Sequence, residues 1–156
     1  MKKLLSITLV SVVIILIGSL TLAQEHWVYV TKDIQGSWYY DSNSIKHLPN
    51  KDLQVKIRYE VVKTVGDEFV EFTRKIQLAM CKNAIGKKTE PTADYALGIF
   101  IYEFTYKDGS LMDNLIYEEY YDGNNTLLCS RTIGGSHFTR VLKENVNYLI
   151  YNEISK

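Results

Sequence analysis

The segment Tyr117–Asp122 holds the densest group of side chains that could do chemistry. Three carboxylates (Glu118, Glu119 and Asp122) cluster there with three tyrosines. Carboxylates so close together could bind Ca²⁺ or form the acid–base pair of a hydrolase. The regular oxygen-ligand spacing of a calcium loop is absent, however, and the favoured interpretation is the solvated end of a strand.

The other residue types used in catalysis lack partners at a useful spacing. The histidines His26, His47 and His137 are far apart, and none stands four residues from another, as zinc ligands on a helix do. No serine lies in a Gly-x-Ser-x-Gly motif, and Gly134–Gly135 belongs to no phosphate-binding motif. We therefore expect no enzyme activity, no metal site and no cofactor. A hydrolase with an unrecognised site is the competing hypothesis.

The 12 tyrosines are the one unusual feature of the composition. Tyrosines pack well in cores and across strands, but they also supply large contact area at binding surfaces. Tyr59, Tyr102 and Tyr106 lie on the apolar side of alternating segments, so we assign them to the core.

Two adjacent pairs, Tyr39 with Tyr40 and Tyr120 with Tyr121, are the candidate binding residues. Successive side chains of a strand point to opposite faces, so one member of each pair must point away from the core. We expect those outward members to contact a partner.

Length and composition indicate one folded domain. The chain has 156 residues, no formal net charge and 46% hydrophobic residues, which suits a single domain. The neutral balance argues against nucleic-acid binding, which normally requires a basic excess. The aromatic content of 12% argues against disorder.

Residues 1–23 are typical of a secretory signal peptide. Lys2 and Lys3 precede an apolar run from Leu4 to Leu22, and the small Ala23 follows. We predict cleavage after Ala23, which leaves residues 24–156 as the mature domain. The alternative is an uncleaved membrane anchor, because the run is long enough to span a bilayer.

Cys81 and Cys129 both lie in the mature domain. Two thiols in an oxidising compartment usually pair, so we predict a disulfide between them. Two free thiols are the alternative. Metal binding is disfavoured because neither a Cys-x-x-Cys motif nor a nearby histidine accompanies them.

Alternation of apolar and polar residues predicts most of the secondary structure. Leu53–Val61 is apolar at every odd position, as expected for an antiparallel strand with one solvated face. We expect a turn at 64–67 and a second strand over 68–80, which together form a long hairpin, and then a loop over 82–97.

The C-terminal half continues in the same way. Strands are expected over 99–107, 111–121 and 126–133. Turns are expected at Asp108–Gly109 and at 122–125, and residues 134–136 end the last strand. Short strands over 26–30 and 37–40 precede them in the chain. The tail changes period: Val141, Leu142, Val146, Leu149, Ile150 and Ile154 recur every three or four residues. This stripe predicts a helix that packs on the dry face of the sheet. The fold class is therefore α+β, an antiparallel sheet of about six strands with a C-terminal helix on one face.

Several short motifs resemble the surface-adhesin E family of bacterial envelope proteins. They are a Trp-led strand at Trp27, the run Trp38–Asp41 followed by Ser44–Ile45, a strand that ends in Met80–Cys81, the hairpin turn Lys107–Ser110 and a C-terminal helix. The chain departs from the family in its second cysteine. In family members this residue usually stands near the C-terminus, whereas here it is Cys129, within a predicted strand. Asp41 and Ser44 bracket a turn in which each side chain can bond nearby backbone groups, so we interpret them as structural.

The resemblance implies a small exported domain of the periplasm or cell surface. The named family member is an adhesin that contacts host matrix and serum proteins, so the expected partners are such proteins or another envelope protein. We expect membrane contact only through residues 1–23. An inhibitor of an envelope-targeted enzyme such as lysozyme is the alternative function.

Overall fold

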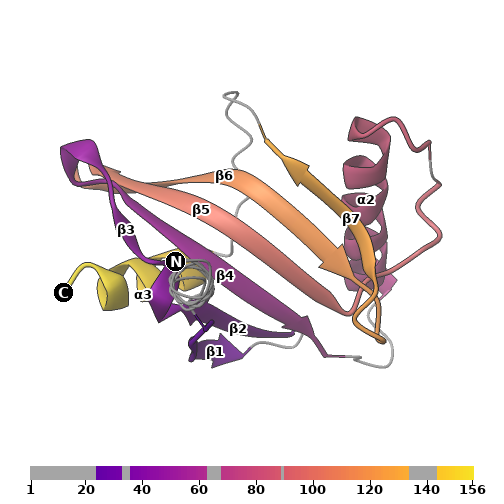
Figure 1. The fold of residues 1–156 in the computed structure, drawn as a ribbon, viewed down its shortest axis with the longest axis horizontal. Coiled ribbons are helices and arrows are strands. Elements are labelled where there is room, and N and C mark those ends of the chain that lie inside the picture. Colours follow the sequence, from indigo (N-terminus) through magenta and orange to yellow (C-terminus); the bar gives the residue numbers. More distant parts are fainter. Residues whose placement is uncertain (1–23, 33–35, 63–67, 89, 134–143) are drawn as a thin grey trace, which may run out of the picture.

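The computed structural model describes residues 24–32, 36–62, 68–88, 90–133 and 144–156. Within these ranges one antiparallel sheet lies against two helices (Figure 1), which confirms the predicted α+β class. The strands are β1 (Trp27–Lys32), β2 (Gly36–Asp41), β3 (Lys46–His47), β4 (Leu53–Val61), β5 (Leu97–Lys107), β6 (Ser110–Tyr121) and β7 (Leu127–Thr132). The helices are α2 (Glu68–Ala84) and α3 (Glu144–Ile154), and the 3-10 turns are η1 (Ser42–Ser44) and η2 (Pro49–Lys51).

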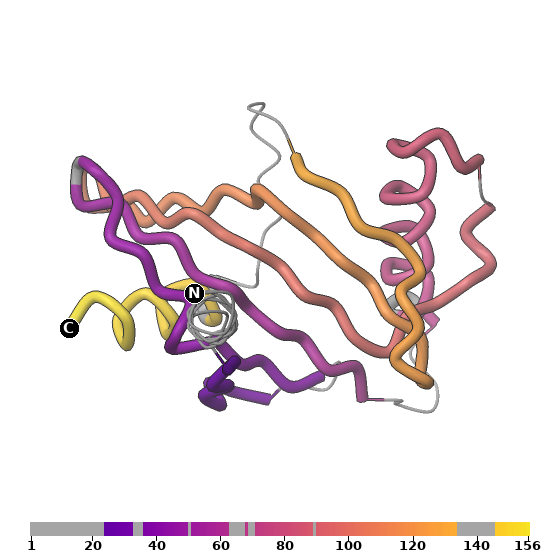
Figure 2. The backbone as a smooth tube through the Cα atoms, viewed as in Figure 1, coloured from indigo at the N-terminus to yellow at the C-terminus, as the bar shows by residue number. Residues whose placement is uncertain are grey.

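The sheet follows the order β1-β2-β4-β5-β6-β7, and the short β3 pairs with β4 beside this path. All neighbours are antiparallel. Figure 2 shows β4, β5 and β6 running side by side through the middle of the sheet. Each of these three strands is therefore hydrogen-bonded on both sides.

The turn between β5 and β6 forms as its sequence predicts. Asp108 and Gly109 have φ values of 52° and 78°, the left-handed conformations that a type I′ turn requires. The following turn is fixed by Asp122, whose carboxylate accepts hydrogen bonds from the backbone N–H groups of Asn124 and Thr126, both at 2.8 Å. These two turns set the register of β6 against its neighbours.

One face of the sheet, here called the inner face, forms the core. The odd residues of β4 lie on it, and Val55 and Ile57 pair with Tyr102 and Phe100 of β5. The alternation predicted for 53–61 is thus confirmed. The other large inner-face side chains in the core are Tyr40, Leu53, Tyr59, Phe104, Leu115 and Tyr120.

Both helices cover the inner face. Leu78 and Cys81 of α2 join the same buried cluster as Val146, Ile150 and Ile154 of α3. Figure 1 shows α2 beside β7 at one end of the sheet and α3 toward the other end. The predicted C-terminal helix on one face is confirmed.

A buried ion pair lies on the inner face. Glu118 of β6 is fully buried, and its carboxylate accepts hydrogen bonds from Arg131 Nε at 2.6 Å and from the Tyr120 hydroxyl at 2.7 Å. A buried charge is tolerated only when it is paired and hydrogen-bonded in this way. Glu118 is therefore part of the core rather than of a solvated strand end.

The prediction of a strand over 68–80 is wrong, because these residues belong to α2. The buried positions Arg74, Leu78 and Cys81 are four and three residues apart, which is the spacing of a helix face. Glu68 and Glu71 in the first turn also suit the helix dipole. The predicted hairpin is absent as well, since β4 pairs with β2 and β5.

Two apolar assignments are also corrected. Tyr106 is 54% exposed, because it lies near the end of the β5–β6 hairpin and stacks on one side only, against Tyr151 at 5.7 Å. Leu149 is 44% exposed, because α3 turns it away from the sheet. Outside the described residues lie the predicted signal peptide (1–23), the turn at 64–67, the strand end at 134–136, and Val141 and Leu142.

The predicted disulfide is present. Cys81 of α2 and Cys129 of β7 are both buried, with their sulfurs 2.12 Å apart and a separation of 48 positions in the sequence. The bond ties α2 to an edge strand of the sheet.

Replacing both cysteines by alanine should lower the free energy of unfolding by about 4 kcal/mol, because a long loop of the unfolded chain is no longer closed. Urea unfolding of the variant and of the oxidised wild-type chain measures this difference. A loss below about 1 kcal/mol would contradict the stabilising role given to the bond.

Candidate functional site

The opposite face of the sheet, here called the outer face, is covered by neither α2 nor α3. Strand register places Tyr39, Arg58, Ile99 and Glu119 in one row across it. Lys56, Ile101 and Tyr117 form the next row. The row beyond Ile99 pairs Leu97 with Tyr121. This face therefore combines half-buried aromatic and aliphatic side chains with charges of both signs.

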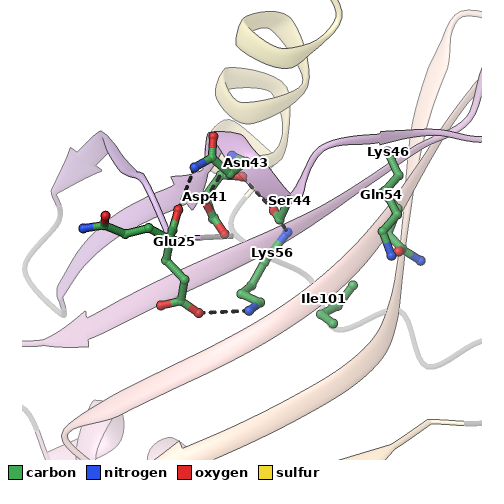
Figure 3. Close-up of a pocket in the computed structure, with 9 residues that line it drawn as sticks. Glu25, Asp41, Asn43, Ser44, Lys46, Gln54, Lys56 and Ile101 are labelled. Carbon is green, nitrogen blue, oxygen red and sulfur yellow. Dashed lines mark hydrogen bonds and ion pairs between the residues drawn. The ribbon is translucent and has the colours of Figure 1, made fainter. Parts of the chain in front are cut away.

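Two adjoining hollows of about 660 and 340 Å³ form a furrow in this face, called here the outer-face furrow. They share Glu25, Lys56 and Ile101 as lining residues. The larger hollow is otherwise lined by Gln24, Asp41, Asn43, Ser44, Lys46 and Gln54 (Figure 3). The smaller is otherwise lined by Trp27, Arg58, Leu97, Ile99, Tyr117, Glu119, Tyr121 and Asn125.

The residues just before β1 form one rim of the furrow. Glu25 makes an ion pair with Lys56 at 3.0 Å, drawn in Figure 3, and the Asn43 side chain donates to the backbone carbonyl of Gln24 at 2.6 Å. The backbone N–H of His26 donates to the Asp41 carboxylate at 2.8 Å. These contacts hold residues 24–26 against the sheet.

The turn after β2 supports this rim. The Asp41 carboxylate also accepts from the Asn43 backbone N–H at 3.1 Å and so caps η1. The Ser44 hydroxyl donates to the Asp41 carbonyl and accepts from the Lys56 backbone N–H, at 2.7 and 2.8 Å. The structural interpretation of Asp41 and Ser44 is confirmed.

Trp27 forms an aromatic wall on the β1 side. Its indole N–H donates to Glu25 at 3.2 Å, and the Arg58 guanidinium lies 5.6 Å from its ring centroid. A cation at this distance over an indole face is attracted to it. Arg58 is held from its other side by an ion pair with Glu60 at 2.5 Å.

Two tyrosines of β6 form the opposite wall. Tyr117 and Tyr121 both donate their hydroxyls to the carboxylate of Glu119, which stands between them in the strand. Burial, followed by the hydrogen bond and negative charge of Glu119, raises the pKa of both phenols above its usual value. Both therefore stay neutral and oriented through the physiological range.

The floor of the smaller hollow is aliphatic. Leu97, Ile99 and Ile101 are half-buried there on β5, which is paired on both sides. The backbone N–H and C=O groups of this strand are hydrogen-bonded to the neighbouring strands β4 and β6. At the floor of the smaller hollow a ligand can therefore be contacted by side chains but not by free backbone groups of β5.

The structure divides the four predicted binding tyrosines between the two faces. Tyr39 and Tyr121 lie on the outer face, and Tyr39 makes an edge contact with the exposed Tyr29 at 5.7 Å. Tyr40 and Tyr120 are 9% and 0% exposed. They belong to the core, so their assignment as binding residues is corrected.

Sequence reasoning left three members of the furrow walls, Trp27, Tyr117 and Glu119, out of the candidate binding residues, although it considered Glu119 for calcium or acid–base chemistry. Tyr117, Glu119 and Tyr121 are spaced two residues apart, so strand alternation alone would have placed them on one face. The position of Trp27 opposite them required the order of the strands.

The predicted absence of catalytic groupings stays a prediction. Glu118 and Glu119 point to opposite faces of β6 and do not form an acid pair. His26 and His47 are exposed on separate elements, and His137 lies outside the described residues. Among the described residues, no group of three or more His, Cys, Asp or Glu side chains could hold a metal ion. The helices in this part of the chain are too short or too polar to cross a bilayer.

Comparisons with known proteins returned no match to a family model, a curated protein or a solved structure. The resemblance to the surface-adhesin E family therefore stays a prediction that rests on its short motifs.

Glu119→Gln should lower the pKa of Tyr117 and Tyr121, because it removes the negative charge that opposes ionisation of both phenols. The ¹³Cζ shifts of labelled tyrosines, followed by NMR between about pH 9 and pH 12, should show that both phenols begin to ionise at a lower pH in Glu119→Gln than in wild type. Glu60→Gln, on the same face but outside this contact, is the matched control and should leave both unchanged. Identical titration curves for wild type and Glu119→Gln would contradict the contact.

Proposed function

We propose that the chain is an exported, non-catalytic envelope or surface protein that binds another macromolecule through the outer face of its sheet. The observation that carries this proposal is the outer-face furrow, whose aromatic walls are fixed by hydrogen bonds and by a cation–π contact. Tyrosine and tryptophan held in this way give contact area at little further cost in conformational entropy.

Two features support export. The first 23 residues have the basic start and apolar run of a secretory signal. The buried disulfide between Cys81 and Cys129 is a bond that persists in oxidising compartments.

The chemistry of the furrow supports binding rather than turnover. Its one carboxylate on β6, Glu119, is already engaged by two phenols. Glu25 is paired with Lys56, and Arg58 is paired with Glu60. A general acid or base needs a side chain poised to exchange a proton with substrate. These charges instead hold one another and the aromatic rings in place.

Host matrix or serum proteins, or another envelope protein, are the proposed partners. The binding experiment uses the full chain, expressed with its own leader and recovered from the envelope, against a panel of immobilised matrix, serum and envelope proteins. The intact mass of the same preparation, with and without reductant and alkylating agent, reports leader removal and thiol pairing.

Tyr39→Ser combined with Tyr121→Ser should weaken binding to the captured partner at least about tenfold, because an anchor residue is worth more than about 1 kcal/mol. Tyr148→Ser is the matched control. Tyr148 is an exposed tyrosine of α3, away from the outer face, and its loss should change affinity less than about twofold. Surface plasmon resonance provides both values.

Equal losses in the two variants, or no binding to any panel member, would overturn the proposal. A lysozyme assay in parallel separates the alternative function. An unchanged lysozyme rate agrees with the proposal, whereas stoichiometric inhibition would assign the inhibitor role instead.

A further inference from the structure

The outer-face furrow carries no net charge. Its acidic lining residues are Glu25, Asp41 and Glu119, and its basic ones are Lys46, Lys56 and Arg58. Charge complementarity favours a partner whose charge has the opposite sign. A balanced lining therefore selects against sulfated or phosphorylated polyanions and against polycations.

The two hollows differ in chemistry. The larger one presents the side chains of Gln24, Lys46 and Gln54. Its other polar groups, those of Asp41, Asn43 and Ser44, are already engaged in the hydrogen bonds described above. The smaller one presents the ring of Trp27 and the rings of Tyr117 and Tyr121 above an aliphatic floor. A ligand that fills both must combine apolar surface with many hydroxyl or amide groups.

The strands beneath the furrow offer such a ligand no free backbone groups, because the edges of the described sheet are β1 and β7. Strands β4, β5 and β6 beneath the furrow are each paired on both sides. A peptide that binds by adding a strand needs a free sheet edge. A ligand bound at the middle of the outer face meets side chains. This suits a ligand that has hydrogen-bonding groups on all of its sides.

We infer that the outer-face furrow binds a neutral oligosaccharide, carried as a glycan chain on the macromolecular partner. The C–H face of a sugar ring is apolar and packs on an aromatic ring, whereas its hydroxyls need polar partners when water is removed. The aromatic walls supply rings for the apolar face of the sugar, and the amide-rich larger hollow supplies polar partners for its hydroxyls. Each hollow lies within the range of about 300–1,000 Å³ that small-molecule sites occupy. This inference rests on the proposed function, since it names the part of the partner that is recognised.

Trp27 gives the test a specific signal. The chain has two tryptophans. Trp27 lines the furrow, whereas Trp38 packs on Tyr59 of the inner face, with ring centroids 4.3 Å apart. A sugar stacked in the furrow should therefore change the fluorescence of Trp27 alone.

The probes are the neutral hexasaccharides of N-acetylglucosamine, mannose and galactose, with a heparin hexasaccharide as the charged comparator, each titrated into the full chain. At least one neutral probe should change the fluorescence saturably with a Kd of about 1 mM or tighter, and heparin should bind at least about tenfold more weakly. The change should be lost in Trp27→Phe and kept in Trp38→Phe. No saturable change with any neutral probe, or tighter binding of heparin, would overturn the inference.

Substitutions that leave the core intact provide the second measurement. Lys46 is exposed and Gln54 half-buried at the polar end of the furrow. Lys46→Ala with Gln54→Ala should weaken probe binding about fivefold or more in isothermal calorimetry, whereas Phe72→Ala with Tyr148→Ala on the helices should not. Equal affinities in the two double variants would place the sugar elsewhere and contradict the inference.

The macromolecular partner separates this inference from the proposed function. Enzymatic removal of its neutral glycans should abolish binding to the full chain. The deglycosylated partner could still bind the wild-type chain and bind the Tyr39→Ser with Tyr121→Ser variant more weakly. In that case the glycan inference fails while the proposed function stands. If neutral hexasaccharides bind but no macromolecule does, the proposed function fails and the sugar site stands.

Discussion

Burial of one face of the sheet beneath two helices is the constraint on which the rest of the structure depends. Strand alternation sends every second side chain of β4, β5 and β6 to the inner face. There they meet Leu78 of α2 and Ile150 of α3, both fully buried. Burial of an aliphatic side chain of this size contributes roughly 1.5–3 kcal/mol. The disulfide fixes α2 against β7, and the Glu118–Arg131 pair joins β7 to β6.

The same alternation creates the outer face. Once Tyr40 and Tyr120 enter the core, their neighbours Tyr39 and Tyr121 must point the other way. Polar contacts then order this face, because Glu119 orients two phenols and Glu25 holds the segment before β1 against Lys56. A preorganised surface loses less entropy when it binds. The order of the outer face therefore depends on the packing of the inner face.

The sequence predicted the strands well because their two faces differ in polarity. Leu53–Val61 and the hairpin at Asp108–Gly109 carry clear alternation and clear turn residues, and both form as expected. Helix α2 was missed because its exposed face also carries apolar residues. Phe72 and Met80 are 54% and 39% exposed, and with Leu78 they mimic a strand with a period of two. The spacing of Arg74, Leu78 and Cys81 was the helical signal.

The site was only partly predictable for a different reason. Alternation shows that one tyrosine of each adjacent pair faces outward, but not which one. The furrow also depends on register across β1, β2, β4, β5 and β6, with irregularities at Tyr29/Thr31 and Ile101/Tyr102. Such shifts move side chains from one face to the other. No local pattern in the sequence reveals that Trp27 stands opposite Tyr117.

Hydroxyl-radical footprinting of the full chain, with and without a bound matrix or serum protein, tests the central claim most directly. The account predicts that Trp27, Tyr39 and Tyr121 are oxidised in the free chain and protected in the complex, while Tyr102 and Tyr120 stay protected in both. Protection confined to Phe72 and Tyr148 on the helices, with the outer-face residues oxidised equally in both states, would contradict it.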